Sequence, residues 1–221
     1  MMGEGDQSLD ALRAQAQEAV RSLRARKPRL DDDAIDLILR DARSHYAWTD
    51  KPVSEEMLRT LYEITINGPT SMNTCPARFI FVTTDAAKTR LAKSLKPKNV
   101  EKMRAAPVTA IIAWDPDYWR KLDFLFPHED RKPLFDGKPD YAHDTAYRNS
   151  TLQGAYFMIA ARAMGLDVGA MSGFSNAIVD EEFFAENGWK SNFLCNIGYA
   201  DETALFQKLP RFGFDDICEI I

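Results

Sequence analysis

The sequence predicts one domain of the α/β or α+β class, in which helices surround a single sheet. The first observation is an alternation along the chain between segments of helical periodicity and short, continuous apolar runs. The second is size, because 221 residues that are 45% hydrophobic suffice to bury one sizeable core. The third is that no apolar run is long enough to span a membrane or resembles a secretory signal, which predicts a cytoplasmic protein with no membrane partner.

Residues 1–31 differ in composition from the remainder of the chain. They combine Ala, Arg, Gln and Glu with few large apolar residues, and Lys27-Pro28 interrupts the helical pattern. We expect a peripheral helix or a partly disordered arm here, followed by a domain over residues 32–221.

Two helices open the predicted domain. Asp31 to Asp33 place acidic side chains in the first turn of a helix that we expect to end near Arg43. Ser54 is a suitable N-cap for a second helix, which Gly68-Pro69 should stop.

Three apolar runs and one long helix supply the rest of the predicted core. Phe79–Val82 and Val108–Trp114 are continuous apolar runs, typical of strands covered on both faces, and Phe193–Tyr199 predicts a last strand. Ala142–Met164 predicts a long helix whose small residues allow another helix to approach closely, and Gly165 should end it.

Composition also excludes some classes of partner. The net charge is -5 and no long basic run follows residue 31, so there is no electrostatic basis for binding nucleic acid. The cysteines lack a CxxC spacing, which predicts reduced thiols, and the histidines lack partners at metal-site spacing, which predicts no metal. These residues are Cys75, Cys195, Cys218, His45, His128 and His143. A small-molecule site is the expected alternative.

A polar turn stands between the second helix and the first apolar run. In the stretch NGPTSMNTCPARFIFV, Thr70, Ser71 and Asn73 gather short hydroxyl and amide groups next to a strand. Two interpretations fit these residues. They form either an ordinary chain reversal, which favours the same residue types for local reasons, or part of a binding site.

Three further clusters favour the second interpretation. RSHYAW places Arg43 and Ser44 at a predicted helix end, and KLPRF places Lys208 and Arg211 on a proline-stiffened segment. Separated arginines on irregular segments suit a phosphate, although solvated basic corners would look the same. The loop GAMSGF, Gly169 to Phe174, follows a predicted strand and precedes a helix capped by Ser175, so it offers free backbone N–H groups, as a tight connection also would.

The order and spacing of these pieces resemble the FMN-dependent nitroreductase family, over about residues 32–221. The motifs that carry the resemblance are Arg43-Ser44, Gly68-Pro69-Thr70-Ser71 with Asn73 and Pro76, Gly165-Leu166-Asp167 leading to Gly173-Phe174, and Pro210-Arg211. Finer stretches such as APVTAIIAWD, YRNSTLQGAY and LPRF are similar to the branch that contains malonic-semialdehyde reductase of pyrimidine-nitrogen catabolism.

The resemblance implies an α+β fold, an α/β sandwich with a central, mostly antiparallel sheet inside helices, and a homodimer with FMN in grooves at the subunit interface. The matching cofactor positions are Arg43, Ser44, His45, Tyr46, Lys208 and Arg211 around the phosphate, Pro69, Thr70, Ser71 and Asn73 around the ribityl chain and ring from across the dimer, and Met171, Ser172 and Gly173 at the reactive edge. Asn149 and Gln153, on the long helix, are further candidates for this groove. Many members carry an arginine where this chain has Tyr46.

The same resemblance explains why no acid–base triad is visible, because the flavin carries the chemistry and NAD(P)H is the co-substrate. Arg78 and Arg148 are candidates to bind the carboxylate of a short oxo acid, or else form surface or interface ion pairs. Phe124, Phe126 and Phe135 lie in a stretch that forms an excursion over the active site in this family, so they either line its mouth or pack a long connection.

Three hypotheses follow. The first is an FMN-dependent NAD(P)H oxidoreductase that reduces malonic semialdehyde to 3-hydroxypropionate. The second is the same scaffold acting on nitroarenes, quinones or other enones. The third is a non-enzymatic module that binds FMN.

Overall fold

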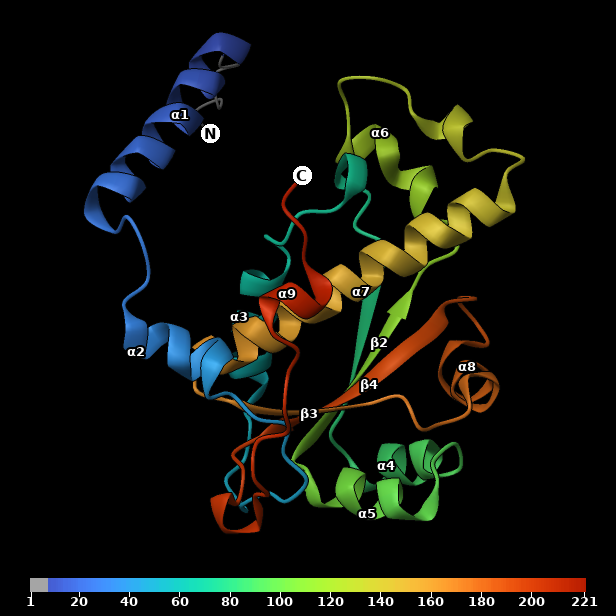
Figure 1. Cartoon of the computed structure of the whole chain (residues 1–221). Coiled ribbons are helices and arrows are strands. Elements are labelled where there is room, and N and C mark those ends of the chain that lie inside the picture. The colour runs from blue at the N-terminus through green and yellow to red at the C-terminus, as the bar shows by residue number, and fades with distance from the viewer. Residues whose placement is uncertain (1–7) are drawn as a thin grey trace, which may run out of the picture. The chain divides into compact units, whose positions relative to one another are not determined.

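The apolar runs of the chain form a four-stranded antiparallel sheet. The computed structural model describes residues 8–221. Its strands are β1 (Ala77–Val82), β2 (Val108–Trp114), β3 (Asp167–Met171) and β4 (Lys190–Gly198). They lie side by side in the order β1-β2-β4-β3 (Figure 1), so β1 and β3 are the outer strands. Each neighbouring pair is antiparallel, which confirms the expected α+β class.

Strand β2 lies at the centre of the core because every one of its residues is buried. Its side chains alternate between the two faces of the sheet. Ala110 and Ile112 join a cluster with α3 (Glu55–Thr65) and α7 (Pro139–Ala163), whereas Ile111 joins a cluster on the other face. The sheet is therefore covered on both faces although it is antiparallel.

The other face of the sheet is covered by three shorter helices. These are α4 (Asp85–Ala92), α5 (Pro97–Ala105) and α8 (Asn176–Phe184), which Figure 1 shows on the side of the sheet away from α7. Buried residues from these helices, among them Leu91 and Met103, meet Ile111 and Leu194 of the sheet.

Glycine permits a close approach of α7 to the sheet. A Cβ atom on Gly154 would come within 2.5 Å of the Phe193 ring, so the small residue allows the helix to lie directly on β4. The predicted long helix is confirmed, and it begins three residues earlier than expected, with Pro139 at its first position.

The segment between β2 and α7 forms an excursion with its own small core. It contains a 3₁₀ turn at Tyr118–Lys121, α6 (Leu122–Leu125) and a 3₁₀ turn at Lys132–Leu134. Of the two interpretations for Phe135, the structure supports the packing of a long connection, because Phe135 is 1% exposed and meets the Tyr118 ring edge-on. Its ring closes this small core instead.

The N-terminal residues form a unit of their own. Within the described residues, those up to Asp41 form one compact unit and Ala42–Ile221 form another. The first unit contains α1 (Leu9–Arg26), none of whose residues is buried, and α2 (Asp32–Ile35) with a π-helical turn at Asp36–Arg40. The helix expected to end near Arg43 ends at Arg40, where the guanidinium group pairs with Asp36.

The C-terminal residues after β4 run as an exposed segment. It contains a 3₁₀ turn at Glu202–Ala204 and the short helix α9 (Phe214–Ile217). Large apolar side chains in this segment are exposed, including Phe206 and Phe212. Within residues 8–221, no helix is long and apolar enough to cross a membrane.

Candidate functional site

The polar turn before β1 is the most strained stretch of backbone among the described residues. Met72, Asn73 and Cys75 have φ angles of 51°, 52° and 41°, and these are the non-glycine residues with positive φ in the part of the chain that the structure describes. Each such residue costs about 1–3 kcal/mol and persists only where its surroundings hold it. Sequence reasoning found the turn but not its strain, since no glycine marks the left-handed positions.

Three hydrogen bonds to two other elements hold this turn. The Ser71 N–H donates to Asn149 Oδ1 at 2.8 Å, and the Ala77 N–H donates to Gln153 Oε1 at 2.9 Å. The Asn73 amide donates to the Leu125 carbonyl at 2.8 Å. The turn is thereby fixed to α7 and to the excursion.

The side chains expected on a cofactor line the outer side of the turn. Pro69, Ser71 and Asn73 are exposed, and Thr70 is half-buried, with its hydroxyl accepting the Cys75 N–H at 3.2 Å. Hydroxyl and amide groups of this kind suit a polyhydroxylated ligand.

The second predicted segment, residues 43–46, lies along the outer strand β3. Ser44 bridges to Val168, and the His45 N–H donates to the Val168 carbonyl at 3.0 Å. Gly169 permits this contact, because a Cβ there would come within 2.4 Å of the His45 carbonyl oxygen. Gly169, which the sequence predicts in a loop, instead lies inside β3 and brings the 43–46 segment close to the sheet.

His45 faces the protein interior. It is 8% exposed, and its Nε2 lies 3.2 Å from Asp167 Oδ1. Burial lowers the pKa of His45, an effect that Asp167 only partly offsets and that Arg43 and Arg162 reinforce. Its neighbour Tyr46 is exposed, with the Lys102 ammonium 4.3 Å from its ring centroid. Ser44 is also exposed.

Arg43 links this segment to the C-terminal one. Its guanidinium donates to the Phe206 carbonyl, and its own carbonyl accepts a bond from Arg162 at 3.4 Å. Lys208 and Arg211 are exposed a few residues further on, and Arg211 contacts carbonyls of its own segment. The structure thus links two segments predicted to hold a phosphate, although they are far apart in sequence.

The third predicted segment follows β3. Met171 ends the strand, Ser172 is exposed, and the Gly173 carbonyl accepts a bond from the Asn99 amide at 3.0 Å. The loop is shorter than the sequence suggests, because Gly169 to Met171 belong to the strand. Ser175 precedes α8, but its side chain makes no capping bond.

The polar turn lies far from residues 43–46 within one chain. Ala77, next to the turn, is on β1 opposite Trp114, whereas Ser44 lies beside Val168 on β3, which is opposite Ile197 at the other end of β4. Strand spacings of about 4.8 Å and rises of about 3.4 Å place them roughly 25 Å apart, at opposite corners of the sheet.

Two predicted substrate residues differ in their surroundings. Arg78 Nη2 lies 2.6 Å from Asp115 Oδ2, and its Nη1 contacts the carbonyls of Cys75 and Ala77. The ion-pair interpretation therefore holds for Arg78. Arg148 is exposed on α7, with no polar partner among residues 8–221.

The two predicted aromatic residues lie on the excursion. Phe124 is 84% exposed on α6, and Phe126 is half-buried, with its ring edge-on to His128. Within the described residues, no group of three or more His, Cys, Asp or Glu side chains is placed to hold a metal ion.

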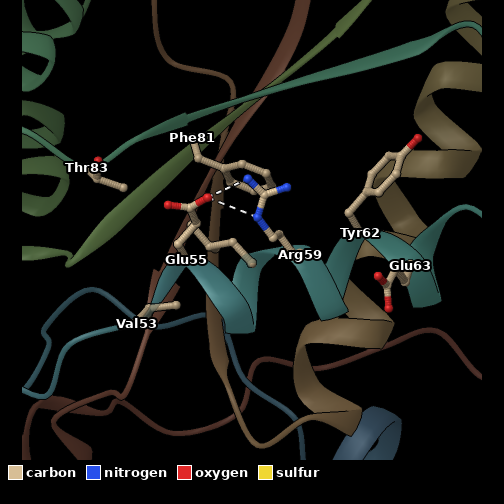
Figure 2. Close-up of a pocket in the computed structure, with 8 residues that line it drawn as sticks. Val53, Glu55, Arg59, Tyr62, Glu63, Phe81 and Thr83 are labelled. Atoms are coloured by element: carbon tan, nitrogen blue, oxygen red, sulfur yellow. Dashed lines mark hydrogen bonds and ion pairs between the residues drawn. The ribbon is translucent and has the colours of Figure 1, made fainter.

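A groove of about 770 Å³ runs between α3 and the outer strand β1, and sequence reasoning missed it. Figure 2 shows the Glu55–Arg59 ion pair on the side of α3 that faces Phe81 of β1. Val53, Leu58 and Tyr62 supply more of the lining. None of the predicted cofactor residues lines this groove. The charged positions Glu55, Arg59 and Glu63 have the four-residue spacing of an ordinary solvated helix face, a pattern that carries no signal of a groove.

Comparison with known proteins identifies the family. The model of the nitroreductase family matches residues 39–199. The chain belongs to the nitroreductase family. A relative from Stenotrophomonas maltophilia (strain K279a), with the provisional name NADH dehydrogenase/NAD(P)H nitroreductase, is 52% identical over 191 residues, which cover 86% of this chain and 97% of the relative. A relative of the same provisional name from Rhodopseudomonas palustris (strain TIE-1) is 48% identical over 192 residues, 87% of this chain and 98% of the relative.

Solved structures agree with the nitroreductase fold. A provisional nitroreductase from Exiguobacterium sibiricum 255-15, solved in complex with FMN, gives a TM-score of 0.75 at 21% identity and covers 87% of this chain and 99% of that one. An enone reductase of gut-bacterial fatty acid metabolism gives 0.75 at 18% identity, covering 87% and 100%. At these identities the likeness concerns the fold alone.

Proposed function

We propose that this member of the nitroreductase family is an FMN-dependent NAD(P)H oxidoreductase that works as a cytoplasmic homodimer. The observation that carries the proposal is the strained polar turn at residues 70–75, since strain of this kind is stored where a ligand needs it. The names of the relatives with about half of their residues in common, NADH dehydrogenase/NAD(P)H nitroreductase, support the same activity.

The residues present fit FMN. Arg43, Lys208 and Arg211 would hold the dianionic phosphate, with the exposed Ser44 hydroxyl as a neutral donor. Thr70, Ser71 and Asn73, with Pro69, would contact the ribityl chain and ring, while Met171, Ser172 and Gly173 would lie at its reactive edge. His45 would act from behind this site, since its ring faces Asp167.

A homodimer would complete the site. Because the polar turn and residues 43–46 lie at opposite corners of the sheet in one chain, a second copy must supply one of them to each FMN. The exposed apolar side chains of the C-terminal segment offer surface for such an interface.

When bound, FMN would supply the chemistry of hydride transfer between NAD(P)H and a second substrate. The chain itself needs to bind and orient the partners. Backbone N–H groups of residues 171–173 would stabilise the negative charge that develops on the ring during reduction. The exposed Phe124 and the half-buried Phe126 would shield the reacting partners from water.

As substrate we propose malonic semialdehyde of pyrimidine catabolism, reduced with NAD(P)H and one proton to 3-hydroxypropionate and NAD(P)⁺. Arg148 is the residue we assign to its carboxylate, because its guanidinium is exposed whereas that of Arg78 is bound to Asp115. The engagement of Arg78 also favours a second candidate function, the reduction of nitroarenes, quinones or enones, which need no cationic partner.

Anaerobic stopped-flow absorbance tests this proposal. The purified chain, reconstituted with FMN, is mixed with NADH or NADPH and then with malonic semialdehyde or a quinone. Bleaching followed by fast recovery with the semialdehyde is the expected result. Recovery with the quinone alone would establish the second candidate instead, and a flavin that never bleaches would leave only non-enzymatic FMN binding.

A phosphate-site variant gives an independent check. Arg211→Ala should weaken FMN binding by about 1.5–3 kcal/mol, the contribution of a charge-assisted hydrogen bond. Arg90→Ala is a matched control, because Arg90 is a partly exposed arginine paired with Glu182. Equal FMN affinity in both variants would refute the phosphate assignment.

A further inference from the structure

We propose that Asn149 and Gln153 are positioning residues that hold the polar turn at residues 70–76 in the shape that FMN requires. The proposal rests on the proposed function, and it changes the role expected for Asn149 from contact with the cofactor to support of the residues that contact it. Both amides point from α7 toward the backbone of the turn.

Burial makes these two amides unusual for polar residues. Asn149 is 3% exposed and Gln153 is 4% exposed. A buried amide must satisfy its hydrogen bonds within the protein, because water cannot replace them. Asn149 does so at both ends, since its Oδ1 accepts the Ser71 N–H and its Nδ2 donates to the Thr145 carbonyl at 2.8 Å.

The two bonds enclose the strained residues. Ser71 precedes the left-handed residues Met72, Asn73 and Cys75, and Ala77 follows them. Asn149 and Gln153 are four residues apart on one helix, so they lie on the same face of α7. Because a long helix is rigid over one turn, this pair fixes the distance between the two ends of the strained stretch.

The turn lacks the usual means of keeping such a conformation. Glycine would adopt the left-handed angles without strain and asparagine tolerates them, but Met72 and Cys75 have no such preference. In the unheld chain these residues would relax to negative φ, and Thr70, Ser71 and Asn73 would lose the backbone positions that bring them together. The amides of α7 therefore maintain the geometry of side chains that they do not touch.

The test compares two buried polar positions on the same helix. Asn149→Leu keeps the approximate volume and removes the acceptor for Ser71, whereas Ser150→Ala removes a fully buried hydroxyl that makes no bond to the turn. FMN affinity is measured by quenching of flavin fluorescence, thermal stability without FMN is measured in parallel, and hydrogen exchange follows the Ser71 and Ala77 amides.

Asn149→Leu should weaken FMN binding about tenfold and accelerate hydrogen exchange at Ser71, because the Ser71 N–H is left without an acceptor. Ser150→Ala should retain the parent's FMN affinity. Equal affinities in the parent and Asn149→Leu would overturn the proposal, even if the variant melts at a lower temperature, since a purely structural amide changes stability alone.

A second variant covers the case in which Asn149→Leu does not fold. Gln153→Met removes the acceptor for the Ala77 N–H at the other end of the turn, so this variant should also bind FMN more weakly than the parent, and an affinity equal to that of the parent would overturn the proposal. A parent chain that binds no FMN would refute the proposed function, whereas faster exchange at Ser71 in Asn149→Leu would still support the role of the amide.

Discussion

Replacement of Arg78 by methionine should destabilise the fold and leave the affinity for a carboxylated substrate unchanged. The Arg78 guanidinium lies 2.6 Å from the Asp115 carboxylate, and its other nitrogen donates to the Ala77 carbonyl at 2.8 Å. Methionine fills much of the same space without charge or donors. The variant therefore leaves Asp115 without its cation.

The expected loss of stability depends on how deeply the Arg78–Asp115 pair is buried. The two side chains are 24% and 17% exposed, so the pair lies between an exposed ion pair, worth about 0–1 kcal/mol, and a buried one, whose disruption costs about 3–5 kcal/mol. We expect a loss of about 2–3 kcal/mol in the free energy of unfolding. In a chain of this size that loss lowers the melting temperature by roughly 5–10 °C.

A double-mutant cycle in urea separates the pair from its surroundings. Parent, Arg78→Met, Asp115→Leu and the double variant should give a coupling energy above about 1 kcal/mol. The exposed pair Arg59–Glu55 is the control, with 74% and 77% exposed side chains and an expected coupling of about 0.5 kcal/mol or less. If Arg78→Met unfolds like the parent but raises KM for malonic semialdehyde selectively, Arg78 binds substrate and the reasoning is refuted.

Three other predictions concern single positions. Gly169→Ala should displace residues 43–46 and weaken FMN retention measured by gel filtration, because its Cβ would meet the His45 carbonyl; an unchanged flavin content would contradict this. Burial lowers the pKa of His45 in the folded chain, so below about pH 6.5 the unfolded chain binds more protons at this residue than the folded chain does. The free energy of unfolding, measured in urea, should therefore fall more between about pH 7.5 and 5.5 in the parent than in His45→Gln. The buried Cys195, whose pKa is raised to about 12 by burial, should react with a thiol reagent only after unfolding, whereas the exposed Cys218 should react at once; rapid labelling of Cys195 would contradict the burial.

The strands of the core could be predicted from the sequence because continuous apolar runs indicate buried segments. Val108–Trp114 is the strand that the sequence predicts, residue for residue, and Ser54 caps α3 by accepting the Met57 N–H. Periodicity and caps depend on neighbours in the chain, so such local elements can be read without the fold. The pairing of the strands depends on contacts between distant segments. Its mostly antiparallel character entered only through the family resemblance, and the strand order was not predicted.

Sequence alone suffices to propose the residue types of the candidate site, but it does not give the partners that these residues contact. Arg78 finds Asp115 thirty-seven residues away, and Asn149 finds Ser71 seventy-eight residues away. Phe135 looked like other aromatic residues of the excursion until the fold enclosed it. The left-handed backbone at Met72 could not be predicted for a different reason. Its surroundings hold it in a strained conformation, and the residue type gives no indication of that conformation.

The strain in the polar turn is related to the separation of the candidate cofactor residues into two groups at opposite corners of the sheet. A turn kept in a left-handed conformation by α7 presents its polar side chains before any ligand arrives, so little ordering cost remains at binding. That arrangement stabilises a complex only if the cationic segments reach the same ligand, and within one chain they lie at the opposite corner of the sheet. The strained turn therefore destabilises each folded chain, whereas the tighter FMN binding that it permits would arise only in a dimer. FMN binding would then couple the folding of each chain to the association of two chains.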